Sequence, residues 1–76
     1  MSKKEKLLEK VRRNPGGLHF ADFITLMRQM DWTLDHQTGS HQIWYSPRGI
    51  RISVQERQGR AKRYQVKQFL EAIGES

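Results

Sequence analysis

The sequence predicts an α+β domain in which helices flank a three-stranded antiparallel sheet. Apolar residues recur at steps of three and four before residue 31 and again after residue 64, which is the spacing of amphipathic helices. Between these segments the apolar period changes to two, the spacing of strands, and turns that contain glycine separate three such runs. With 76 residues the chain forms a single small domain.

The first expected helix covers residues 2–14, which are rich in Lys, Arg, Glu and Leu. A Pro-Gly-Gly run at residues 15–17 ends it. Between positions 3 and 13 it carries six basic and two acidic residues, so it is charged on most sides and we expect it to be loosely attached. The chain therefore divides into an N-terminal helical extension with its linker, residues 1–17, and a core, residues 18–76.

A second helix is expected over residues 19–30, and it is strongly amphipathic. Asp22 lies in its first turn, where a negative charge interacts favourably with the helix dipole. Arg28 and Gln29 fall on its polar side. Its apolar stripe consists of Phe20, Phe23, Ile24, Met27 and Met30.

Three strands are expected next. The first covers residues 32–36, and residues 37–39 reverse the chain because Gly39 can adopt a positive φ without steric cost. The second begins at residue 40 or 41 and ends at Tyr45. The turn Pro47-Arg48-Gly49 then leads into a third strand over residues 50–54.

Residues 56–63 are expected to form an exposed loop, and a last helix begins at residue 64 or 65 and ends at residue 73. Gly74 stops that helix. The resulting order is α-α-β-β-β-α, with the sheet covered by helices on one face and open on the other. This arrangement matches the fold of double-stranded-RNA-binding domains.

Neighbouring side chains on a strand face opposite ways. We expect Ile43 to face the helices and Trp44 to lie on the open face. Alternation then puts His41 on the helix side near the end of the sheet, where it could simply be half-buried. Trp44 and Tyr45 could then offer a stacking surface to unpaired bases. An exposed tryptophan would equally suit a protein partner.

Composition limits the classes of partner. A net charge of +6 and a pI near 10.2 make polyanions the default, nucleic acid first and an acidic protein or membrane surface second. The absence of cysteine excludes disulfides and thiolate metal sites. No apolar run approaches the ~18 residues that cross a bilayer, and the charged N-terminus MSKKEKLL lacks the following apolar stretch of a signal peptide. We expect a soluble, cytoplasmic protein.

A basic cluster precedes the last helix, and no acidic residue lies between its members in the sequence. The cluster consists of Arg57, Arg60, Lys62 and Arg63. The N-terminal amides of that helix also favour phosphate. Arg48 and Arg51 extend the positive character onto the second hairpin. The cluster is a candidate phosphate-binding surface, and the alternative is a solvated loop that keeps the protein soluble.

His41 follows Gly39-Ser40 at the start of a strand, and it is the most suggestive of three histidines. An imidazole can accept or donate a proton near neutral pH, as RNA cleavage without a metal requires. The alternative is a hydrogen-bonded boundary residue. His36 could approach His41 across the hairpin, and His19 begins a helix, but structural roles are expected for both. No carboxylate joins the histidines at the spacing of metal ligands, so no metal is expected.

The run GSHQIW at residues 39–44, which follows a helix and a strand containing Trp32, resembles the core of the HicA toxin family. The similarity extends from about Phe20 to Ile73 and includes the run GRAKRYQVKQFL at residues 59–70. Members of this family are small bacterial ribonucleases, called mRNA interferases, of type II toxin–antitoxin systems. The sequence is similar to a subgroup with an added N-terminal helix.

The resemblance implies the fold of a double-stranded-RNA-binding domain and cleavage of messenger RNA without a metal or small-molecule cofactor. It implies that His41 is the catalytic residue and that a HicB-like antitoxin binds the toxin and blocks its active surface. Many family members carry a Pro-x-His element after the third strand, whereas this chain has Ser53-Val54-Gln55-Glu56 there.

The leading hypothesis is therefore an endoribonuclease toxin with His41 as the general acid/base. The alternatives are a non-catalytic basic RNA-binding module of the same fold and a protein-interaction domain whose basic face binds an acidic partner. No membrane partner is expected. The residues predicted to contact RNA are Gly39, Ser40, Arg48, Arg51, Arg60, Lys62, Arg63 and Lys67.

Overall fold

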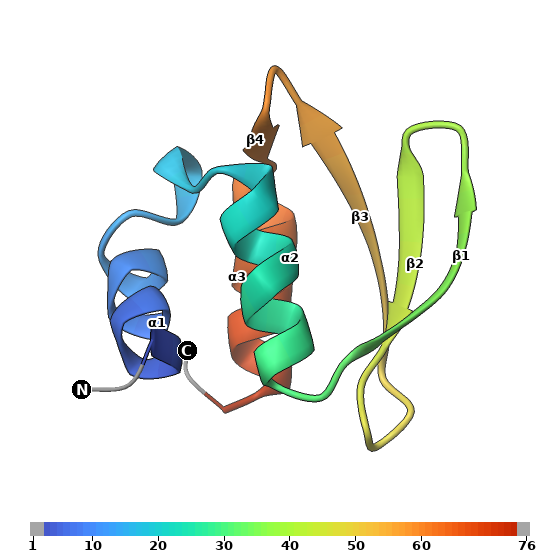
Figure 1. Ribbon diagram of the computed structural model, residues 1–76, viewed down its shortest axis with the longest axis horizontal. Helices are drawn as coiled ribbons and strands as arrows, with labels where there is room; N and C mark the ends of the chain where they lie inside the picture. Colours follow the sequence, from blue (N-terminus) through green and yellow to red (C-terminus); the bar gives the residue numbers. More distant parts are fainter. Residues whose placement is uncertain (1–2, 75–76) are drawn as a thin grey trace.

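A computed structural model describes residues 3–74 and places all three of their α-helices on one side of an antiparallel sheet, as Figure 1 shows. The α+β class and the arrangement of a double-stranded-RNA-binding domain are confirmed. The strands pair in the order β1-β2-β3-β4. The elements are α1 (Lys3–Arg13), the short 3-10 helix η1 (Pro15–Gly17), α2 (Phe20–Gln29), β1 (Thr33–Thr38), β2 (His41–Tyr45), β3 (Arg51–Arg57), β4 (Arg60–Ala61) and α3 (Arg63–Ala72).

The sheet has one strand more than the three that the sequence predicted. Residues 56–63, expected as a loop, form the end of β3, a two-residue turn, β4 and, after residue 62, the first residue of α3. Gln58 and Gly59 in that turn both have positive φ, 53° and 78°, which is the pattern of a type I′ hairpin turn. Such turns favour Asn or Asp before the glycine, so glutamine concealed the hairpin. The N–H of Ala61 also donates to the carbonyl oxygen of Leu18, which fixes β4 to the segment before α2.

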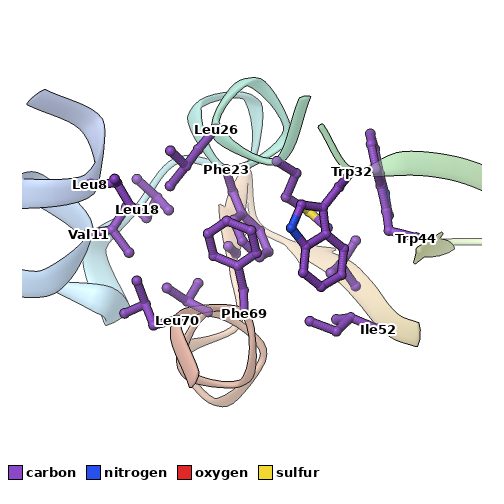
Figure 2. Close-up of a cluster of buried hydrophobic side chains, with 14 residues drawn as sticks. Leu8, Val11, Leu18, Phe23, Leu26, Trp32, Trp44, Ile52, Phe69 and Leu70 are labelled. Carbon is purple, nitrogen blue, oxygen red and sulfur yellow. The ribbon is translucent and has the colours of Figure 1, made fainter. Parts of the chain in front are cut away.

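The core lies between the helices and the sheet. The rings of Phe23 on α2 and Phe69 on α3 meet edge to face with centroids 5.5 Å apart, and Trp32 lies 5.4 Å from Phe69 (Figure 2). Offset and edge-to-face contacts of this kind add to the stabilisation that burial of the rings provides. Within residues 3–74, no helix is long and apolar enough to span a membrane.

The first helix is packed against this core rather than loosely attached. Val11 is completely buried and Leu8 is nearly so, and Figure 2 shows both side chains directed toward Leu18 and Leu70. The expectation of loose attachment was wrong because it counted the charges and not their placement. One apolar stripe suffices to dock a helix whose other sides are charged.

The side chains of the second strand, β2, point to the opposite faces of the sheet from those predicted. Trp44 pairs with Ile52 on β3, and both side chains belong to the core beneath the helices. Trp44 is 1% exposed, whereas Ile43 pairs with Ser53 and points to the other face. The prediction that Trp44 lies on the open face was therefore wrong. Tryptophan has the larger apolar area, so its burial dominates the choice of face.

Polar contacts complete the burial of Trp44. Its indole Nε1–H donates to Oε1 of Gln42, two residues earlier on the same face, at 3.0 Å. The guanidinium of Arg28 on α2 lies 5.5 Å from the centroid of the ring, within the range of a cation–π interaction. Arg28, expected simply on the polar side of its helix, therefore also covers the sheet.

Replacing Val11 with alanine tests the attachment of α1. Because the valine side chain is fully buried, we expect the free energy of unfolding to fall by about 2 kcal/mol, the value of two buried methyl groups and the cavity that they leave. The matched control is Lys6→Ala, which changes an exposed residue of the same helix. Urea denaturation measures both. Equal midpoints for the two variants would contradict the packing of α1.

Candidate nucleic-acid interface

His41 is the first residue of β2, and its side chain is exposed on the open face of the sheet. Its register partners are Thr38 on β1 and Gln55 on β3. The expectation of a half-buried position on the helix side was wrong, and the reason is the reversed phase of β2. Within residues 3–74 the imidazole has no hydrogen bond or ion pair. Its ring nitrogens are therefore available to a ligand.

A tight turn holds His41 in place. Gly39 has φ of +59° at the first position of the two-residue turn between β1 and β2, as in type II′ hairpins. Nε2 of Gln55 donates to the hydroxyl oxygen of Ser40 at 3.0 Å, and Nε2 of Gln37 donates to the carbonyl oxygen of Gly39 at 3.1 Å. The turn is thus tied to both β1 and β3.

A β-bulge in β1 brings a second histidine to this face. The register shifts between Leu34 and His36, so that His36 faces Ile43 and Thr38 faces His41. Nδ1 of the His36 ring lies 2.6 Å from the carboxylate Oδ2 of Asp35, within hydrogen-bond distance. Within residues 3–74, no group of three or more His, Cys, Asp and Glu side chains is arranged to hold a metal ion.

The basic cluster lines a hollow of about 570 Å³ where the β3–β4 turn meets the start of α3. No side chain caps that end of α3, so the positive end of the helix dipole adds to the positive charge there. Nη1 of Arg60 donates to the carbonyl oxygen of Gly17 at 3.4 Å, which directs its side chain toward η1. The cationic residues of the hollow are Arg57, Arg60, Lys62, Arg63 and Lys67.

Arg57 connects the hollow with His41. It lies two residues beyond Gln55 on β3, so strand alternation places it on the same face as Gln55 and diagonal to His41. The β1–β2 and β3–β4 turns lie at the same end of the sheet in Figure 1. Arg57 thus lies on the open face beside His41 and also lines the basic hollow at the same end of the sheet.

Two of the predicted RNA-binding residues lie elsewhere. Arg51 shares the face of His41, but it pairs with Tyr45 at the other end of β2, roughly 13 Å away at the rise of a strand. Arg48 lies in the β2–β3 turn and borders a different hollow beside Trp32. The structure therefore gathers Gly39, Ser40, Arg60, Lys62, Arg63 and Lys67 at one end of the sheet and leaves Arg48 and Arg51 at the other.

Sequence reasoning missed two features of this surface. Gln55 entered the sequence analysis only as part of the run at residues 53–56 that lacks the Pro-x-His element, although it binds the turn that carries His41. Tyr64, which is 59% exposed, lines the basic hollow and offers the aromatic surface that was expected of Trp44. The signal for Tyr64 was present, since it directly follows Lys62-Arg63 at the start of an amphipathic helix.

The fold and this surface together define a small domain of the double-stranded-RNA-binding type with a cationic surface at one end of its sheet. The family model described as "HicA toxin of bacterial toxin-antitoxin" matches residues 20–75. The chain therefore belongs to the HicA toxin family, whose members act as the toxin of a toxin–antitoxin pair. No curated protein and no solved structure matches it significantly.

Replacing Gly39 with alanine tests the turn. A Cβ at position 39 meets no atom within 4 Å, but the positive φ costs an L-residue roughly 1–2 kcal/mol, and we expect the free energy of unfolding to fall by about that amount. Gly16→Ala is the matched control, because its φ is not positive and its Cβ makes ordinary contacts with Arg63. Thermal unfolding compares the two. A Gly39 variant as stable as the control would refute the turn geometry.

Proposed function

We propose that this toxin is an endoribonuclease that cleaves messenger RNA in the cytoplasm without a metal cofactor, with His41 as a general acid/base. Membership of the HicA family and the resemblance of the Gly39-Ser40-His41 run to the family's catalytic motif support this activity. The observation that carries the proposal is the position of His41. Its imidazole is exposed on the open face, at the end of the sheet where the basic residues gather.

The chemistry needs few groups. The 2′-hydroxyl of a ribose attacks the adjacent phosphorus, the bond from phosphorus to the 5′-oxygen breaks, and the products end in a 2′,3′-cyclic phosphate and a 5′-hydroxyl. A side chain that moves a proton in this step accelerates it by ~10²–10⁴-fold. His41 performs this proton transfer. Arg57, diagonal to it, is placed to stabilise the charge that develops on the phosphate.

The basic hollow holds the RNA backbone beside His41. Its arginine and lysine side chains attract phosphates, and Tyr64 can stack on an unpaired base at its rim. An RNA strand that passes from the hollow round the β3–β4 end of the sheet and across Arg57 reaches the imidazole on the open face. A HicB-like antitoxin that covers this face excludes RNA and so inhibits the toxin.

The second candidate function is RNA binding without cleavage, and Gln55 favours it. Many relatives that the sequence resembles carry a histidine after the third strand, whereas here the register partner of His41 is a glutamine, which cannot exchange a proton. A binding module would keep the salt-sensitive affinity of the basic hollow and leave RNA intact.

Replacing His41 with glutamine separates the two functions. We expect cleavage of a cellular mRNA by the purified protein to slow by ~10²–10⁴-fold, because glutamine keeps the size of the side chain but not its proton transfer. His19→Gln is the matched control, since His19 is also exposed but lies at the start of α2. The rate is read from RNA fragments on a denaturing gel.

Intact RNA after prolonged incubation with the unmodified protein would instead support the binding module. Equal cleavage by the unmodified protein and the His41 variant would assign the activity to another residue or to a contaminant. Growth arrest on expression, relieved by His41→Gln, tests the same assignment in cells.

Replacing Lys67 with alanine tests the hollow. Lys67 is exposed on α3, so its removal leaves the core unchanged and deletes one phosphate contact. In the His41→Gln background, where RNA stays intact, we expect the slope of log affinity against log salt to decrease by about one. Arg48→Ala is the control, because Arg48 lies at the other end of the sheet and the slope should not change. A smaller slope with Arg48→Ala and an unchanged slope with Lys67→Ala would contradict binding of RNA in the hollow.

A further inference from the structure

His36 and Asp35 form a pair on β1 that the proposed mechanism does not use. Both side chains are about half exposed, 52% for His36 and 53% for Asp35, and the carboxylate Oδ2 lies 2.6 Å from the ring Nδ1. Exposed ion pairs contribute little to stability. Neither packing nor a contribution to stability therefore explains this contact.

The β-bulge produces the pair. Adjacent residues on a regular strand point to opposite faces, so their side chains cannot meet at 2.6 Å. The extra residue between Leu34 and His36 turns both side chains to one side. Without the bulge Asp35 would face Ile43, and His36 would face Gln42 on the helix side. Bulges are frequent beside active sites, where they redirect a side chain.

The same shift sets the distance between the two histidines. His36 faces Ile43 and Thr38 faces His41, so His36 and His41 are diagonal neighbours on the open face. Diagonal neighbours on antiparallel strands lie roughly 7–8 Å apart. The attacking and leaving oxygens lie on opposite sides of the phosphorus, and imidazoles on diagonal neighbours are placed to reach one oxygen each.

We propose that His36, oriented by Asp35, is the second proton-transfer residue of the ribonuclease, an inference that rests on the proposed function. An ionised carboxylate only accepts hydrogen bonds, so the contact favours a proton on Nδ1 of His36, and in the neutral ring of that tautomer Nε2 presents its lone pair. Nε2 accepts the proton of the 2′-hydroxyl as the oxygen–phosphorus bond forms. His41 donates a proton to the 5′-oxygen as its bond to phosphorus breaks. The catalytic pair then spans β1 and β2, and no histidine at position 55 is needed.

The experiment compares two leaving groups. One oligoribonucleotide has the natural 5′-oxygen at the position that the unmodified protein cleaves, and the other has a bridging sulfur there. A thiolate leaves without protonation, so the sulfur substrate does not need the general acid. With the oxygen substrate, we expect His36→Gln and His41→Gln each to slow cleavage by ~10²–10⁴-fold. With the sulfur substrate, we expect His41→Gln to recover most of the rate and His36→Gln to recover none.

Two further variants separate catalysis from folding. Asp35→Asn retains the imidazole of His36 but replaces the carboxylate, which only accepts, by a neutral amide that can accept or donate, so the tautomer is no longer fixed, and we expect a smaller loss of rate than with His36→Gln. Thr33→Ala changes an exposed residue on the same face at the far end of β1 and should cleave as the unmodified protein does. Thermal unfolding of each variant shows that the fold is retained.

The possible failures are distinguishable. If the unmodified protein leaves the oxygen substrate intact, or if His41→Gln cleaves it at the full rate, the proposed function itself fails. If the unmodified protein cleaves and His41→Gln does not, but His36→Gln keeps the full rate on both substrates, only the role of His36 is overturned. Recovery of His36→Gln by the sulfur substrate would likewise overturn its assignment as the base.

Discussion

The burial of Trp44 beneath α2 and α3 determines which face of the sheet is open. Its indole packs with Ile52 and Val54, donates its N–H to Gln42 and lies under the guanidinium of Arg28. Because strand alternation is strict, this one side chain also fixes the direction of His41, three residues earlier. A slip of one residue in β2 would turn the imidazole toward the helices and expose the tryptophan. The same contact therefore stabilises the core and presents the candidate site.

One face of the sheet packs against the helices and contributes to stability, and the other face carries the candidate site. The helix-covered face carries the core side chains Trp44, Ile52 and Val54, whereas β1 is exposed along its whole length. Residues of β1 and of the turn after it can therefore diverge without loss of the core, which suits a surface that must fit a ligand. The bulge at Asp35 uses this freedom, since an edge strand tolerates an extra residue better than a central strand does.

The two apolar helices and the turn before His41 could be predicted from sequence because their signals are local. Stripes at steps of three and four identify α2 and α3, and glycine identifies the turn. The face of Trp44 could not be predicted, because Ile43 beside it is also apolar and the register depends on the length of the β2–β3 turn. The bulge is equally invisible, since nothing local distinguishes Asp35 from a paired strand residue. The candidate site depends on both features. His41 could therefore be singled out from the sequence, but the geometry around it could not be predicted.

The packing of α1 bears on why so small a domain can leave one face of its sheet open. The family match begins at residue 20, so α1 lies outside it, yet Leu8 and Val11 are buried against Leu18 and Leu70. A chain of this length buries only about 60% of its unfolded surface, and every apolar contact on the helix side counts. By covering that side, α1 adds to the core without touching β1 or β2 (Figure 1). The polar side chains around His41 can then remain exposed to a ligand while the opposite face supplies the stability of the fold.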